Sequence, residues 1–214
     1  MKLYTYFRSS TAYRVRIALN LKGLEYEAVP IHLVRGGGEQ KSSAYQAINP
    51  QALVPALDVD GQVLTQSLAI MEYLEETHPE PALLPADALG RARVRAIALA
   101  IACEIHPINN LRVLHYLAGT LALDQRQKDA WYRHWVESGL LAVEAMLAGR
   151  SETGVFCHGD NPGLADCCLL PQVFNAQRFK CDLAAMPTIR RIAANCQELP
   201  AFAKAAPEAQ PDFE

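Results

Sequence analysis

The sequence lacks the features that mark several classes of protein. Its six cysteines include no Cys-x-x-Cys pair, so the usual zinc and dithiol-redox motifs are absent and we expect no metal site. The longest apolar run, near residues 97–103, is far shorter than the roughly 20 residues of a membrane-spanning helix. With a net charge of −3 and no basic half, the chain also lacks a surface suited to nucleic acid.

The first residues lack the apolar core and the small-residue cleavage site of a secretion signal. We therefore expect a cytoplasmic protein whose cysteines are reduced, buried thiols. Half of the 214 residues are hydrophobic, which is enough to bury a substantial core in one large domain or two small ones.

The first 80 residues alternate between strand and helix patterns. The patterns predict strands at residues 2–7, 25–33, 56–59 and 63–65, and helices at residues 11–22 and 67–76. Asp60-Gly61 favours a tight hairpin turn between the last two strands, because glycine tolerates positive φ. Ser67 is expected to cap the second helix. The order is β-α-β followed by β-β-α, which indicates a small α/β domain over residues 1–80.

A proline-rich linker over residues 78–88 separates this domain from a helical half. Helical periodicity predicts helices at residues 91–105, 125–148, 164–178 and 188–196, with no strand pairs. Pro107 should end or kink the first of them. We therefore expect an all-helical domain over residues 88–214, with an irregular tail from Ala206.

Three hydroxyl residues, Ser9, Ser10 and Thr11, lie between the first strand and the first helix. A helix N-terminus has unpaired N–H groups and a partial positive charge, which stabilise an anion. A hydroxyl group there can donate a hydrogen bond to a thiolate and lower the pKa of the thiol. From spacing alone, a simple helix cap explains these residues better than a thiolate site does.

The segment from Ser9 to Leu19 nevertheless resembles the signature of the zeta-class glutathione transferases. That signature reads Ser-Ser-Cys, two variable positions and Arg-Val-Arg-Ile-Ala-Leu, and this chain departs from it only by Thr11 in place of cysteine. The resemblance extends over nearly the whole chain. It implies a cytosolic glutathione transferase fold, with a thioredoxin-like N-terminal domain plus an all-α C-terminal domain, and a homodimer. It also implies that Ser9 or Ser10 activates the thiol of glutathione, and the loss of cysteine at position 11 does not put this activation in doubt.

Three further segments match positions at which this family contacts glutathione. The resemblance implies a cis-proline at Pro55, with the Val54 backbone pairing with the cysteinyl backbone of glutathione like an added strand. It implies that Gln66 and Ser67 hold the γ-glutamyl carboxylate at a helix start, and that Gln40 contacts the glycyl end. Without the resemblance, these segments are an ordinary strand start, a helix cap and a glycine-rich loop that lacks the Lys-Ser/Thr of a P-loop.

In the helical half, residues 106–112 resemble a zeta-class segment near the glutathione site. The resemblance implies roles there for His106, Asn110, Leu111 and Arg112, although His106 also suits a helix end and Arg112 a surface charge. Residues 163–166 lie where glutathione transferases usually have the N-capping box Ser/Thr-x-x-Asp, here with Gly163 in place of the hydroxyl residue, and we expect a role in folding rather than in chemistry.

Two arginines indicate the class of substrate. Arg178 matches a family position close to the substrate, and Arg8 precedes Ser9. Guanidinium groups bind carboxylates bidentately and stay charged, so an arginine at each end of a pocket suits a small dicarboxylate. We therefore expect a glutathione-dependent cis–trans isomerase of maleylpyruvate or maleylacetoacetate, with glutathione as its cofactor. A transferase that conjugates glutathione to haloacids and a non-catalytic binding protein are the alternatives.

Overall fold

The computed structural model describes residues 1–214, which form two compact units. The first unit contains Met1–Leu83 together with Gln197–Glu214, and the second contains Leu84–Cys196. The sequence patterns placed the last residues with the helical domain, whereas in the structure they pack on the first unit. The reason is helix α9 (Pro200–Ala205), which packs against the first helix of the chain.

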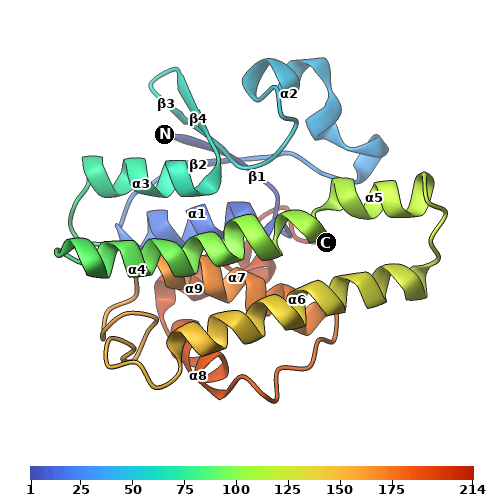
Figure 1. Cartoon of the computed structure of the whole chain (residues 1–214). Helices are drawn as coiled ribbons and strands as arrows, with labels where there is room; N and C mark the ends of the chain where they lie inside the picture. The colour runs from blue at the N-terminus through green and yellow to red at the C-terminus, as the bar shows by residue number, and fades with distance from the viewer. The chain divides into compact units, whose positions relative to one another are not determined.

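The first unit is a four-stranded mixed sheet with helices on both faces. Its elements in chain order are β1 (Lys2–Thr5), α1 (Ser10–Leu21), β2 (Glu27–Pro30), α2 (Ser43–Ile48), β3 (Ala56–Val59), β4 (Gln62–Thr65) and α3 (Ser67–Thr77). The sheet order is β2-β1-β3-β4, in which β1 and β2 are parallel and the other pairs are antiparallel. Helices α1 and α3 lie on one side of the sheet and α2 on the other (Figure 1). This is the thioredoxin-like arrangement expected from the sequence.

Of three local predictions in this unit, the hairpin turn and the cis-proline are confirmed and the helix cap at Ser67 is wrong. Asp60 and Gly61 have φ values of 51° and 85°, as a type I′ hairpin turn requires, so the predicted hairpin is confirmed. The Val54-Pro55 peptide bond is cis, as the resemblance implied. The predicted cap at Ser67 is wrong, because Gln66 occupies the N-cap position and Ser67 is the first helical residue.

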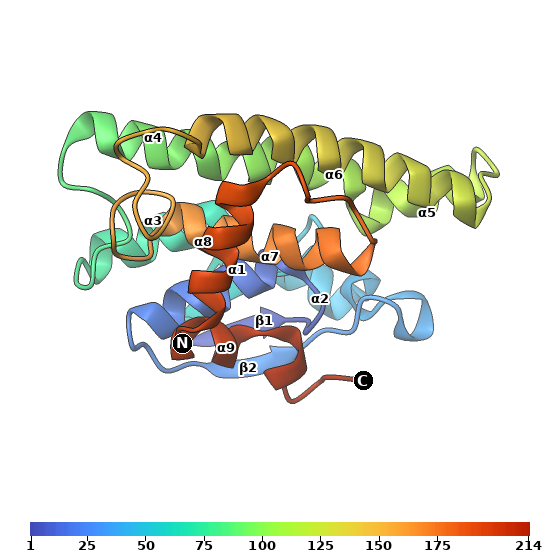
Figure 2. The same cartoon turned by 90° about the horizontal axis from the view of Figure 1, so that it is seen from below.

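The second unit is helical. Its main helices are α4 (Ala88–Leu99), α5 (Leu111–Gly119), α6 (Gln125–Leu147), α7 (Leu164–Arg178) and α8 (Pro187–Gln197), and Figure 2 shows α4 and α6 side by side. Helix α4 continues into the π-helical segment Ala100–Ile105, after which Pro107 begins a short 3₁₀ turn, so the predicted helix end near Pro107 is confirmed. A Cβ atom on Gly139 of α6 would lie 2.4 Å from Ile105 Cγ1, so the glycine allows this close packing.

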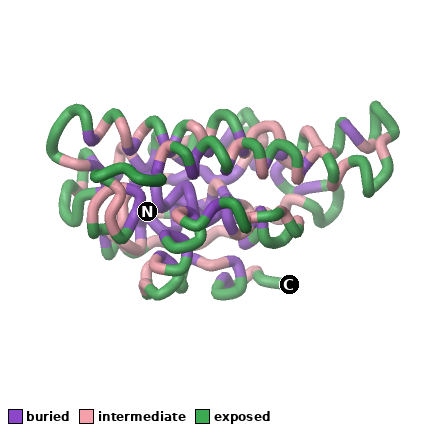
Figure 3. The backbone as a smooth tube through the Cα atoms, turned by 60° about the horizontal axis from the view of Figure 1, so that its bottom comes forward, coloured by how far each residue is buried: buried purple, intermediate pink, exposed green.

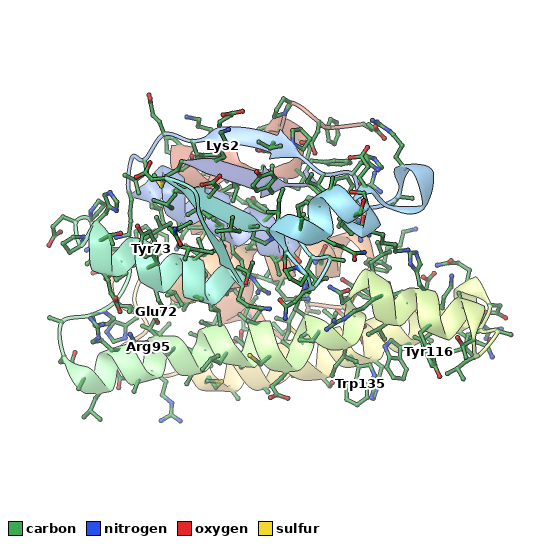
Figure 4. All side chains as sticks on the ribbon, turned by 90° about the horizontal axis from the view of Figure 1, so that it is seen from above. Lys2, Glu72, Tyr73, Arg95, Tyr116 and Trp135 are labelled. Atoms are coloured by element: carbon green, nitrogen blue, oxygen red, sulfur yellow. The ribbon has the colours of Figure 1, made fainter.

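Buried and exposed residues alternate along the helices of both units (Figure 3). The helical stretch Ala88–Gly119 is long and apolar enough to cross a membrane. Core helices of soluble proteins meet the same two criteria. Its residues Ile97 and Ile101 are fully buried. Tyr116 on α5 and Trp135 on α6 are exposed at the surface of the helical unit (Figure 4).

Candidate active site

A tight turn joins β1 to α1 and carries Ser9. Ser9 N donates a hydrogen bond to Tyr6 O (2.9 Å), and Ser9 Oγ accepts one from Ala12 N (3.2 Å), so Ser9 is the N-cap of α1. The buried Arg16 donates to the carbonyl oxygens of Tyr6 (3.3 Å) and Phe7 (3.0 Å) from inside the unit. Burial lowers the pKa of Arg16 to about 10, so its guanidinium remains charged at neutral pH.

The hydroxyl groups of Ser9 and Thr11 form a directed chain. Thr11 Oγ1 donates to Val54 O at 2.8 Å, and Ser9 Oγ lies 2.9 Å from Thr11 Oγ1. A threonine hydroxyl has a single proton, so Ser9 must be the donor in the second contact. The chain joins the N-terminus of α1 to the cis peptide bond before Pro55. Ser10, in contrast, is a buried residue of the first helical turn.

The N-terminus of α3 is in contact with a buried cation, the guanidinium group of Arg14. Arg14 is 1% exposed, and its Nη1 donates to Ser67 Oγ at 3.3 Å. Because the guanidinium uses a lone pair of Ser67 Oγ, the hydroxyl proton remains available to a different acceptor. The buried charge adds to the positive end of α3, so this position favours a carboxylate.

The Gln66 side chain is oriented by a neighbour. Gln66 Nε2 donates to Gln51 Oε1 at 2.7 Å, which leaves the Gln66 amide oxygen as an acceptor for an ammonium group. Neither Gln51 nor Arg14 was assigned a role from the sequence. Arg14 could have been suspected, because a charged residue on the buried side of a helix needs a polar partner.

The side chain of Gln40 folds back onto the loop that carries it. It is buried, and its Nε2 donates to Leu33 O at 3.4 Å. A Cβ atom on Gly38, whose φ is +107°, would lie 2.6 Å from Gln40 Nε2, so only glycine allows this fold-back. The contact of Gln40 with the glycyl end of glutathione stays a prediction.

The helical unit presents the other predicted site residues in one connected stretch. His106 follows the π-helical segment, and its N donates to Ile101 O at 3.0 Å. Asn110 caps α5, with its Oδ1 accepting from Arg112 N at 3.1 Å, and Leu111 is the first helical residue. Their roles toward glutathione stay predictions.

The two arginines assigned to the substrate each stack on an adjacent ring. The Arg8 guanidinium lies 4.8 Å from the centre of the Phe7 ring, and that of Arg178 lies 4.8 Å from the centre of the Phe179 ring. Arg8 belongs to the first unit and Arg178 to the second, at the end of α7. Their convergence on one substrate stays a prediction.

The first unit is a thioredoxin-like domain in which the N-termini of α1 and α3 and the cis-proline loop offer polar groups to an anionic ligand. Accordingly, residues 3–82 match the family described as "Glutathione S-transferase, N-terminal domain". A maleylpyruvate isomerase from Ralstonia sp is 54% identical over 212 residues, which are 99% of each chain. The chain belongs to the zeta-class glutathione transferase family that includes the maleylpyruvate and maleylacetoacetate isomerases.

Two solved structures support the same grouping. The holo structure of a maleylpyruvate isomerase, a bacterial zeta-class glutathione transferase, has a TM-score of 0.97 at 53% identity and covers 100% of both chains. A maleylacetoacetate isomerase from Anaeromyxobacter dehalogenans has a TM-score of 0.86 at 44% identity, and covers 100% of this chain and 97% of its own. That structure holds dicarboxyethyl glutathione and citrate in its active site.

Proposed function

We propose that this protein is a glutathione-dependent cis–trans isomerase of maleylpyruvate or maleylacetoacetate, acting in the cytoplasm in the breakdown of aromatic compounds. The observation that carries the proposal is the 54% identity to a maleylpyruvate isomerase across 99% of the chain. The Anaeromyxobacter relative, with a dicarboxyethyl adduct of glutathione in its site, supports glutathione as the cofactor and a small dicarboxylate as the substrate. We further infer a homodimer from family membership.

The polar groups of the first unit fit the parts of glutathione. The Val54 backbone offers an N–H and a carbonyl to the cysteinyl peptide. Ser67, with Arg14 behind it at 3.3 Å, offers a hydroxyl proton and a positive helix end to the γ-glutamyl carboxylate. The resemblance assigned Gln66 to the γ-glutamyl carboxylate together with Ser67; because Gln51 accepts from Gln66 Nε2 at 2.7 Å and so orients the side chain, we propose instead that the Gln66 amide oxygen binds the neighbouring γ-glutamyl ammonium group. Every charged end of the cofactor except the glycyl one therefore has a complementary group.

Bound glutathione supplies a thiolate that adds to the cis double bond of the substrate and leaves again after the bond has rotated. Ser9 stabilises this anion in our proposal. When a thiolate is present, the Ser9 proton can turn from Thr11 toward the sulfur, while Thr11 keeps its bond to Val54 O. The positive end of α1 acts in the same direction, because the helix dipole favours an anion at its N-terminus.

Arg8 and Arg178 act on the substrate in this proposal. Each guanidinium binds one carboxylate, and together they stabilise the negative charge that develops on the keto end as the double bond becomes single. Ring stacking keeps both guanidinium groups oriented without neutralising them. The proposal therefore separates the roles of the arginines from the binding of glutathione.

The ultraviolet change of maleylpyruvate, with and without catalytic glutathione, tests the function. Conversion to fumarylpyruvate without net loss of glutathione is the expected result, and maleylacetoacetate is assayed in parallel to rank the two substrates. Conversion matched mole for mole by thiol loss would instead identify a conjugating transferase. A protein that is not retained on a glutathione column would be a non-catalytic member of the fold.

A further inference from the structure

The last residues of the chain contact two loops, the one between β1 and α1 and the one between β2 and α2. Each of these loops carries a residue that we propose to bind glutathione. We call Asp212–Glu214 the C-terminal clasp. Asp212 Oδ2 accepts a hydrogen bond from Phe7 N at 3.0 Å, although the two residues are 205 positions apart in sequence. The ring of Phe213 packs edge-on against the ring of Phe7, with centroids 5.5 Å apart.

The bond from Phe7 N completes the turn that carries Ser9. Within this turn, Ser9 N already donates to Tyr6 O, and Arg16 binds the Tyr6 and Phe7 carbonyl oxygens. The Phe7 N–H is the second amide of a four-residue turn and has no acceptor inside it. Phe7 is 1% exposed, so without the Asp212 carboxylate this donor would be buried and unpaired.

The clasp also contacts the loop that leads to Gln40. Glu214 forms an ion pair with Arg35, and its Oε2 lies 3.4 Å from His32 Nε2. His32 Nδ1 accepts from the backbone N atoms of Val34 (3.2 Å) and Arg35 (2.7 Å), so the ring proton is on Nε2, facing Glu214. Glu214 and Arg35 are both exposed, so this pair is the weaker half of the clasp.

The tail that carries the clasp is itself fastened to the first unit. Gln210 Nε2 donates to the carbonyl oxygens of Lys204 and Ala206, both at 2.9 Å. Arg16, which holds the Ser9 turn, also donates from its Nε to Ala205 O at 3.0 Å. One buried guanidinium therefore links α9 to the Ser9 turn, and Asp212 reaches the same turn from the other end of the tail.

We propose that Asp212 is a positioning residue, which holds the turn before Ser9 so that the Ser9 hydroxyl and the α1 N-terminus meet the sulfur of glutathione. The inference rests on the proposed function, because it assigns Asp212 to the glutathione site of that function. Asp212 acts through the Phe7 amide and touches neither cofactor nor substrate. Glu214 adds a smaller contribution through the loop before Gln40.

The test compares Asp212→Ala, Asp212→Asn and the control Glu208→Ala, an exposed acidic residue of the same tail. Calorimetry, well below the unfolding temperature of each variant, gives the dissociation constant of glutathione, and ultraviolet titration gives the pKa of the bound thiol. Asp212→Ala should weaken glutathione binding by about tenfold, because a turn that loses a hydrogen bond to a charged group, about 1.4 kcal/mol, leaves its binding-competent conformation, and the dissociation constant rises by the corresponding factor. Asp212→Asn keeps an acceptor without the charge and should weaken binding by about threefold. Glu208→Ala should leave binding unchanged.

A structural role alone would lower the unfolding temperature of the Asp212 variants and leave both glutathione readouts unmoved, which would overturn the proposal. If Asp212→Ala does not fold, Asp212→Asn decides: wild-type affinity and wild-type thiol pKa in that variant would refute the role of the carboxylate. A wild-type protein that does not bind glutathione would instead refute the proposed function itself. The two failures are therefore distinguishable in one experiment.

Discussion

Replacing Ser9 by alanine removes two interactions with separate measurable effects. The first is the N-cap bond from Ala12 N to Ser9 Oγ at 3.2 Å. Losing a serine cap costs about 1 kcal/mol, which for a chain of this length lowers the unfolding temperature by roughly 2–4 °C. The second is the hydrogen bond that we assign to the thiolate of glutathione, which contributes about 1.5–3 kcal/mol because its acceptor is charged.

The loss of that second bond should raise the pKa of the bound thiol by about one to two units, since one unit corresponds to 1.36 kcal/mol. In the wild type, a thiol pKa that is lower in the complex than in free glutathione means that binding releases a proton. Glutathione binding should therefore tighten as pH rises through the interval between the two pKa values. In the Ser9→Ala variant this pH interval should be narrower, because the thiol pKa in the complex, its lower end, rises while the pKa of free glutathione stays the same.

Thiolate absorbance in the ultraviolet, followed against pH with glutathione bound, measures this pKa directly. Ser9→Thr is the matched control, because threonine keeps both the cap and the hydroxyl proton. If Ser9→Ala loses the stability of the cap but leaves the bound thiol pKa unchanged, Ser9 is only a helix cap. If Ser10→Ala raises the pKa instead, the contact with sulfur belongs to Ser10.

Three further predictions address other parts of the molecule. Arg178→Ala should reduce turnover of a maleyl substrate by at least about tenfold while changing glutathione affinity little, with partial activity in Arg178→Lys; equal losses in both kinetics and affinity would contradict its assignment. Asp166→Asn should lower the free energy of unfolding in urea by about 1–3 kcal/mol, because the two carboxylate oxygens accept from Cys157 N and Gly163 N, both at 2.9 Å, and an amide has only one acceptor. Burial raises the pKa of Asp166 more than these bonds lower it, so the stability advantage of the wild type should shrink as pH rises from the ordinary carboxyl pKa to the raised one. Burial also raises the pKa of Cys157, Cys167 and Cys196, so mass spectrometry should find these thiols unalkylated in the native protein at neutral pH and alkylated after unfolding.

The elements that local patterns predicted well are those whose signals lie within a few residues. The hairpin at Asp60-Gly61 depends on two residues that accept positive φ, and α7 has the predicted bounds, Leu164–Arg178. The short helices were missed, because α2 and α5 extend over only 6 and 9 residues and give little periodicity. Helix α9 was missed as well, because it extends over only 6 residues and begins at a proline, Pro200, which occupies its first helical position.

The site divides in a similar way between local and distant information. Ser9, Thr11, Val54 and Ser67 could be named from motifs, since each lies beside a helix start or a cis-proline whose sequence pattern is short. The role of Asp212 could not be predicted, because its hydrogen bond to Phe7 N joins the two ends of the chain. No periodicity or spacing rule connects residues that far apart, so only the folded structure shows that they meet.

Thr11, the one departure from the family signature, shows how a substitution can preserve a site while changing its connections. A cysteine at this position would offer a weak S–H donor, whereas the threonine hydroxyl donates to Val54 O at 2.8 Å and accepts from Ser9. The two chain segments proposed to bind the sulfur and the cysteinyl backbone are thereby joined by one strong hydrogen bond. The threonine at position 11 therefore lacks the reactive thiol of the family's cysteine but links the Ser9 turn more strongly to the cis-proline loop. For this reason we assign thiolate activation to Ser9 and the joining of the two loops to Thr11.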